Sequence, residues 1–133
     1  MTVTEGERGR AAVFGYGSLV SLTSLAEVLG RPAHGSTRAR LPGWRRRWSL
    51  QRHNLRSEKT FELADGSRPT WILSLNIERA PGSDAAPNGL LFDVSEDELV
   101  RLDSRERRYD RVDVTSEIDV AETRRPAGRI YTY

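Results

Sequence analysis

Short segments with strand character dominate this 133-residue chain, and turn-forming residues separate them. Two segments with helical spacing interrupt the strands, at about residues 22–29 and 96–108. Because most strands are joined by short turns, the pattern predicts an α+β fold: a small mixed, largely antiparallel β-barrel flanked by helices. Strands are expected over residues 11–14, 36–41, 44–50, 61–63, 70–77, 88–94, 109–114 (continuing toward 120) and 128–133.

Length and composition restrict the classes of protein that this chain can belong to. The length suits one domain over residues 11–133, preceded by a disordered arm over residues 1–10. No apolar run is long enough to span a bilayer, and the arm lacks the apolar segment of a signal peptide, so we expect a cytoplasmic protein without a membrane partner. The chain has no cysteine, which excludes disulfides and thiol catalysis. A net charge of only +2 disfavours a nucleic-acid partner.

Local signals define the expected ends of the helices and one hairpin. In the first helix, Ser24 and Glu27 have capping-box spacing, and Gly30 is expected to end the helix. For the second helix, Ser95 is the expected N-cap, with a reciprocal glutamate three residues later. The pair Asp65-Gly66 predicts a hairpin between residues 61–63 and 70–77.

Glu106 is the first candidate functional residue. On the second predicted helix, Leu99, Leu102 and Glu106 stand at i, i+3 and i+7, which is the spacing of a buried stripe. A carboxylate on such a stripe is costly unless it is paired or has a chemical role. Three explanations remain open at this stage: an ion pair with an arginine, a helix that has already ended at residue 106, or a proton-transfer site.

The loop Gly15-Tyr16-Gly17-Ser18-Leu19 is the second candidate. It leaves a predicted strand and enters a predicted helix, and its two glycines allow successive N–H groups to point to one side. Such a nest binds a carboxylate, a phosphate or an oxyanion. An ordinary strand–helix turn is the alternative. A dinucleotide-binding fingerprint fits poorly, because Val20 occupies the position of the third glycine.

Taken together and in this order, these segments resemble a known family. Residues 13–19, Val-Phe-Gly-Tyr-Gly-Ser-Leu, look like the N-terminal signature of γ-glutamylcyclotransferase-like proteins. Residues 102–106, Leu-Asp-Ser-Arg-Glu, followed by Tyr109-Asp110-Arg111, look like the segment that carries the family's catalytic glutamate. Residues 41–48 and 88–94 are similar to two of the family's strands. The resemblance covers about residues 11–133.

The resemblance implies a reaction and a set of site residues. A γ-glutamyl amide (a γ-glutamyl amino acid, a γ-glutamylamine or glutathione) would cyclise to 5-oxoproline and release an amine. Glu106 would be the catalytic general base and acid, and the amides of Gly15, Tyr16, Gly17, Ser18 and Leu19 would bind the substrate carboxylate. Tyr109 and Tyr131 are further candidates for the same pocket. Neither a metal nor another cofactor is implied, and the partner is a small-molecule substrate.

Two rivals to an enzyme are also considered. One is a non-catalytic binding protein with the same fold and pocket. The other is a nucleic-acid-binding module in which Trp44-Arg45-Arg46-Arg47-Trp48 stacks on and clamps a single strand. The same five residues fit an amphipathic strand whose tryptophans pack while the arginine stems cover apolar surface. Isolated His34 and His53 give no ligand spacing for a metal.

Overall fold

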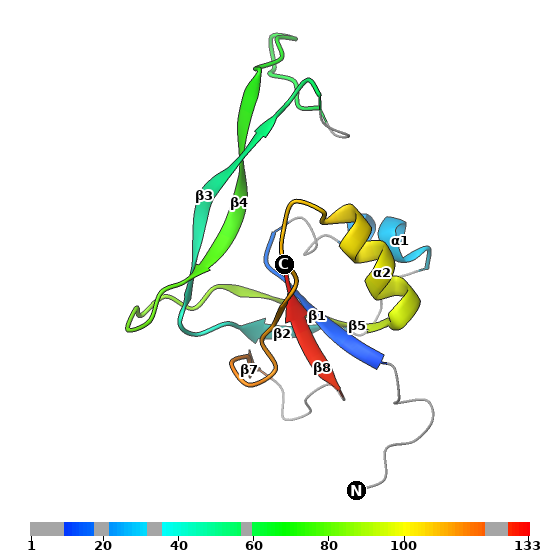
Figure 1. Cartoon of the computed structure of the whole chain (residues 1–133), viewed down its shortest axis with the longest axis vertical. Coiled ribbons are helices and arrows are strands. Elements are labelled where there is room, and N and C mark those ends of the chain that lie inside the picture. The colour runs from blue at the N-terminus through cyan, green and yellow to red at the C-terminus, as the bar shows by residue number, and fades with distance from the viewer. Residues whose placement is uncertain (1–9, 18–21, 32–35, 57–59, 122–127) are drawn as a thin grey trace, which may run out of the picture.

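The computed structural model describes residues 10–17, 22–31, 36–56, 60–121 and 128–133. Figure 1 shows a body of curled sheet and two helices, from which one long hairpin projects. The predicted N-terminal arm lies outside the described residues except for Arg10, which belongs to the first strand. In chain order the elements are β1 (Arg10–Gly15), α1 (Leu22–Leu29), β2 (Thr37–Arg40), β3 (Trp44–His53), β4 (Trp71–Arg79), β5 (Asn88–Ser95), α2 (Glu96–Arg105), β6 (Val112–Asp113), β7 (Asp119–Val120) and β8 (Arg129–Thr132).

The body is built on a six-stranded mixed sheet with the order β6-β8-β1-β5-β2-β7. One of its two central strands, β1, pairs antiparallel with the other, β5, and parallel with β8. The edge strands β6 and β7 belong to one short segment, which turns through hydrogen bonds from the amides of Glu117 and Ile118 to the carbonyl of Val114. Because so short a segment joins opposite edges, the sheet must curl. The mixed α+β class is therefore confirmed, although β6 and β7 do not pair to close a barrel.

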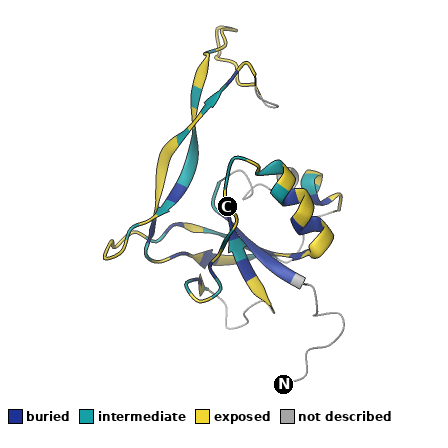
Figure 2. Ribbon diagram, in the orientation of Figure 1, coloured by how far each residue is buried: buried dark blue, intermediate teal, exposed yellow. Residues whose placement is uncertain are grey.

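Alternation along the strands places apolar side chains on both faces of this sheet. On β1, Ala11 and Val13 face α1 and α2, whereas Ala12 and Phe14 face the inside of the curl. The helix-side cluster includes Leu25, Leu99 and Leu102, and the inner cluster includes Leu41, Trp44, Leu91 and Ile130. Figure 2 shows buried residues concentrated in the body, while the projecting hairpin is largely exposed or intermediate.

Helix α2 begins as predicted but ends earlier. The Ser95 hydroxyl accepts a hydrogen bond from the Glu98 amide at 3.2 Å, and the Glu98 carboxylate accepts one from the Ser95 amide at 3.0 Å, so the capping box is present. The helix ends at Arg105, with Glu106 as its C-cap, and not at residue 108 as predicted. The Tyr109 amide donates to the Glu106 carbonyl at 2.9 Å, and this turn takes the chain off the helix axis.

Helix α1 has the predicted bounds. The expected capping box depends on the side chain of Ser24, which lies outside the described part of the chain. Gly30 follows the last helical residue with a φ of 70°, and its amide donates to the Ala26 carbonyl at 2.9 Å. A glycine tolerates this left-handed conformation best, which explains why the helix stops there.

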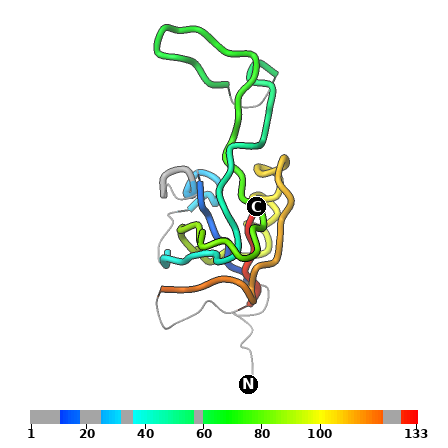
Figure 3. Tube along the Cα trace, turned by 90° about the vertical axis from the view of Figure 1, so that its left-hand side faces the viewer, coloured from blue at the N-terminus to red at the C-terminus, as the bar shows by residue number. Residues whose placement is uncertain are grey.

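The projecting hairpin differs most from the sequence prediction. Strands β3 and β4 pair along almost their whole length, from Trp44↔Arg79 to His53↔Trp71, with a bulge between Trp48 and Leu50. Residues 61–63 form no strand. They lie within the loop between β3 and β4, where Asn54 bonds both main-chain groups of Phe61. The predicted Asp65-Gly66 turn is present, but it lies within this loop instead of joining two paired strands. Figures 1 and 3 both show the hairpin extending beyond the body.

An ion pair between the helices supports a pH-dependent prediction. The Arg31 side chain donates to Glu98 at 2.6 and 3.0 Å, and this bond holds the Glu98 pKa below its usual range. A lowered carboxyl pKa stabilises the fold above the unfolded pKa of about 4.3, and the stabilisation disappears as pH falls through the folded pKa.

We expect Arg31→Gln to lower the free energy of unfolding by about 1 kcal/mol at pH 7, since Arg31 is partly exposed. The deficit should shrink near pH 3.5, as measured by urea unfolding. The exposed pair of Arg45 and Glu78 supplies the control, Arg45→Gln, for which little change is expected. An equal deficit for Arg31→Gln at both pH values would contradict this account.

Candidate functional site

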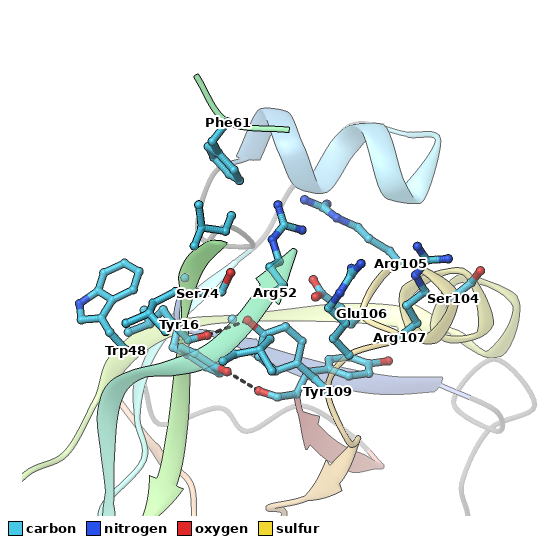
Figure 4. A pocket seen from close by; sticks show the side chains of 18 of the residues that line it. Tyr16, Trp48, Arg52, Phe61, Ser74, Ser104, Arg105, Glu106, Arg107 and Tyr109 are labelled. Carbon is cyan, nitrogen blue, oxygen red and sulfur yellow. Dashed lines mark hydrogen bonds between the residues drawn. The ribbon is translucent and has the colours of Figure 1, made fainter. Parts of the chain in front are cut away.

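A cavity of about 790 Å³ lies between the projecting hairpin and the body. Figure 4 shows side chains from both parts around it. The body contributes the end of β1, the end of α2 and the C-terminal tyrosine, and the hairpin contributes a mainly apolar wall. The residues that line the whole cavity are Phe14, Gly15, Tyr16, Gly17, Trp48, Leu50, Arg52, Phe61, Glu62, Leu63, Pro69, Ile72, Leu73, Ser74, Leu75, Ser104, Arg105, Glu106, Arg107, Arg108, Tyr109 and Tyr133.

Glu106 lies in this cavity because α2 ends there. Its amide still donates to the Leu102 carbonyl at 2.8 Å, so the residue keeps the helical position that the stripe predicted, directly beyond buried Leu99 and Leu102. Its side chain is partly buried and points into the cavity in Figure 4. Glu106 therefore follows the buried residues Leu99 and Leu102 along the helix, and it is also the C-cap of that helix.

The glycine loop meets Glu106 across the same cavity. Gly15, Tyr16 and Gly17 line it, whereas Ser18 and Leu19 lie outside the described residues. Gly15 is the last residue of β1, and neither Gly15 nor Gly17 has a positive φ. In the described part of the loop, residues 15–17, neither glycine therefore adopts the left-handed conformation that only glycine adopts easily. Binding of an anion by the loop amides remains a prediction.

Three tyrosines frame the cavity as neutral hydrogen-bond donors. Burial raises the pKa of Tyr16, of Tyr109 and of Tyr133, and the negative charge of Glu106 contributes to each increase. The Tyr16 hydroxyl donates to the main-chain oxygen of Tyr133 at 2.6 Å, and the Tyr109 hydroxyl donates to the Leu75 carbonyl at 2.7 Å. The Tyr133 hydroxyl donates to the Asp103 carboxylate. All three hydroxyls are therefore engaged and protonated near neutral pH.

Tyr131, a predicted pocket residue, lies elsewhere. It packs against the helix-side cluster, and the guanidinium of Arg111 lies 4.7 Å from its ring centroid. Tyr131 on β8 and Tyr133 just after it lie on the helix-side face, and of these two residues Tyr133 lines the cavity. The parallel register with β1, which pairs Val13 with Tyr131, sets this difference, and the sequence of β8 alone does not encode it.

Comparison with known proteins supports the fold and nothing narrower. The solution structure of At3g28950.1 from Arabidopsis thaliana has a TM-score of 0.56 at 24% identity, and the match covers 93% of this chain and 61% of that protein. The solution structure of At5g39720.1 from the same plant has a TM-score of 0.59 at 24% identity, with coverages of 94% and 68%. The likeness shows the fold. By these coverages, this chain spans only part of the length of both proteins. No protein-family model matches the chain, and no curated protein sequence does.

The hairpin supplies the part of the cavity that the sequence did not predict. Trp48, Arg52 and Leu73 come from β3 and β4, and Phe61 comes from the loop between them. The Arg52 guanidinium lies 5.3 Å from the centroid of the Phe61 ring. The one available signal was the density of apolar residues in an otherwise polar stretch, because large exposed apolar side chains indicate a binding surface.

Most residues of the strand proposed to clamp nucleic acid make hydrogen bonds within the protein. Trp44 is buried, and its indole nitrogen donates to Glu117 at 3.2 Å. Arg45 and Arg47 both bond Glu78, and Arg46 bonds the carbonyl of Asn88. The amphipathic-strand interpretation is confirmed for Trp44, which packs in the core, but it is wrong for Trp48, which is 65% exposed and lines the cavity.

Metal and membrane sites receive no support from the part of the chain that the structure describes. Within these residues, no three histidine, cysteine or acidic side chains gather closely enough to hold a metal ion. None of the described helices has the length and apolar character needed to cross a membrane.

One hydrogen bond joins the hairpin to the end of α2 and supports a stability prediction. We expect Tyr109→Phe to lower the free energy of unfolding by about 1 kcal/mol, because the Leu75 carbonyl loses its donor across the cavity. Tyr131→Phe is the matched control, since its hydroxyl has no hydrogen-bond partner among the described residues and little change is expected. Thermal unfolding of both variants measures the difference, and equal melting temperatures would contradict the prediction.

Proposed function

We propose that this chain is a γ-glutamylcyclotransferase-like enzyme that converts a γ-glutamyl amide to 5-oxoproline and a free amine. One observation carries the proposal: Glu106 and the Gly15–Gly17 segment, which are far apart in the sequence, line one cavity. These are the two segments on which the family resemblance rests. A cavity of about 790 Å³ is also within the usual range for small-molecule sites, roughly 300–1,000 Å³.

The proposed reaction needs two proton transfers. The substrate's α-amine attacks its own γ-carbonyl carbon, so a C–N bond forms and closes a five-membered ring while the attacking nitrogen loses a proton. The original amide C–N bond then breaks, and the leaving nitrogen gains a proton. Glu106 accepts the first proton and donates it to the leaving nitrogen, so it ends the cycle as it began.

The other groups around the cavity leave Glu106 as the best proton carrier. The hydroxyls of Tyr16, Tyr109 and Tyr133 have raised pKa values and already donate to protein oxygens. The remaining lining carboxylate, Glu62, is exposed and lies 3.7 Å from Arg68. In this proposal the amides of the Gly15–Leu19 loop bind the substrate α-carboxylate and stabilise the tetrahedral oxyanion.

The test is an assay of 5-oxoproline release from glutathione, γ-glutamyl dipeptides and γ-glutamylamines. We expect enzyme-dependent release from at least one of these classes. Release from none of them, with the protein folded, would reject the enzyme and leave a binding protein of the same fold. Calorimetry with the same compounds would then decide whether the cavity binds them.

A further inference from the structure

The hairpin side of the cavity is an apolar wall that faces solvent. Of seven large apolar side chains exposed among the described residues, six lie between residues 48 and 73. Four of these six line the cavity: Trp48, Phe61, Leu63 and Leu73. Soluble proteins seldom expose apolar side chains in such a cluster unless a ligand or partner covers them. Here they surround a hollow that also contains Glu106, which favours a ligand.

The charge of the cavity indicates the second property of that ligand. Four arginines line it, namely Arg52, Arg105, Arg107 and Arg108, against the two carboxylates Glu62 and Glu106. Arginine binds carboxylates through paired N–H donors. Of these four arginines, Arg52 comes from the hairpin. It is partly buried and stacks over Phe61, so its charge lies within the apolar wall.

We propose that this wall is a leaving-group subsite that selects γ-glutamyl dipeptides whose second residue is large and apolar. This inference rests on the proposed function. With the γ-glutamyl part between Glu106 and the glycine loop, the departing amino acid extends toward the hairpin. Its side chain contacts Trp48 and Leu73, and its carboxylate pairs with Arg52. A γ-glutamylamine lacks that carboxylate, and γ-glutamyl-glycine lacks the side chain, so each makes only part of the contacts.

Three substrates test the two contacts separately: γ-glutamyl-leucine, γ-glutamyl-glycine and the γ-glutamyl amide of 3-methylbutylamine, which is leucine without its carboxylate. We expect kcat/KM for γ-glutamyl-leucine to exceed that for γ-glutamyl-glycine by about 10- to 100-fold. It should exceed that for the γ-glutamylamine by about 10-fold, the effect of one charge-assisted hydrogen bond.

Variants on the hairpin assign each preference to its residue. Trp48→Ala should reduce the preference for leucine over glycine by about 10-fold. The matched control is Trp71→Ala: both tryptophans are on the hairpin and exposed, at 65% for Trp48 and 56% for Trp71, but Trp71 does not line the cavity. Arg52→Gln should remove the preference for the dipeptide over the amine, and Arg56→Gln, outside the cavity, should keep it. Ratios between substrates are compared, so a general loss of activity does not imitate the result.

The outcomes separate this subsite from the proposed reaction. Turnover that is equal for the three substrates, or fastest for γ-glutamyl-glycine, would reject the subsite and leave the cyclotransferase standing. Absence of 5-oxoproline from all three and from glutathione, with calorimetric binding of γ-glutamyl-leucine that Trp48→Ala weakens and Trp71→Ala does not, would reject the enzyme and support the subsite. Absence of turnover of all four compounds, together with absence of binding, would reject both. A dimer that Trp48→Ala dissociates without changing the substrate ratios would assign the wall to self-association and overturn the subsite.

Discussion

Glu106→Gln is expected to lower kcat for 5-oxoproline release by at least about 10²- to 10⁴-fold, the usual cost of losing a general acid–base group. One carboxylate is proposed for both proton transfers, and an amide performs neither. The three tyrosines around Glu106 do not substitute for it, because their hydroxyls stay protonated and donate to protein oxygens. Substrate affinity should change little, since the proposed contacts to the α-carboxylate come from main-chain amides. The measurement is kcat, with binding by calorimetry on the same variant.

The melting temperature of the same variant distinguishes catalysis from a structural ion pair. If Glu106 only forms an ion pair with an arginine, its loss leaves the guanidinium charge without a partner. The melting temperature then falls, and activity falls in step with the folded fraction. If Glu106 is the proton carrier, the variant melts near the wild-type temperature and turns over slowly. Glu96→Gln is the control, because Glu96 starts the same helix, is exposed and lies outside the cavity. Normal turnover per folded Glu106→Gln molecule would remove Glu106 from the mechanism.

Local chemistry made the elements of the body predictable from sequence. The capping box at Ser95 and Glu98 operates within one helical turn, so its residues specify the start of α2 without help from the rest of the fold. Gly43, in the turn between β2 and β3, follows Pro42 and has a φ of 82°, a turn conformation that local chemistry also favours for glycine.

Tertiary contacts decided the features that sequence reasoning missed. Just beyond the end of α2, the Tyr109 hydroxyl donates to the carbonyl of Leu75 on a distant strand, and helical periodicity carries no trace of that bond. The pairing of β3 with β4 spans a long loop, so the local Asp65-Gly66 turn signal pointed to the wrong partner strand. The hairpin's share of the cavity depends on the same pairing. Glu106 was predictable because its anomaly, a charge on an apolar stripe, is local.

Gly89 lies beside the site, and no pattern in the sequence marks it as important. It lies on β5 opposite Ala39 of β2, next to the end of β1. A Cβ atom at this position would lie 2.2 Å from the Gly15 carbonyl oxygen and 2.8 Å from Cε2 of Phe14. The φ of Gly89 is not positive, so conformational freedom is not the reason for glycine here. The reason is the close approach of β5 to the residues that begin the glycine loop.

Gly89→Ala is therefore expected to destabilise the protein by about 3 kcal/mol or more, which is the upper range for forced overpacking. The nearest atom is a backbone oxygen in the β1–β5 ladder, and its displacement would shift Gly15 at the edge of the cavity. For a domain of this size the melting temperature should fall by about 10 °C. Gly17→Ala is the control, since among described atoms only Leu75 Cδ2 comes within 4 Å of its Cβ, at 3.7 Å, an ordinary contact. If Gly89→Ala melted as late as Gly17→Ala, β5 would not approach the loop as closely as the structure places it, and the wall of the site formed by Gly15 would need to be redrawn.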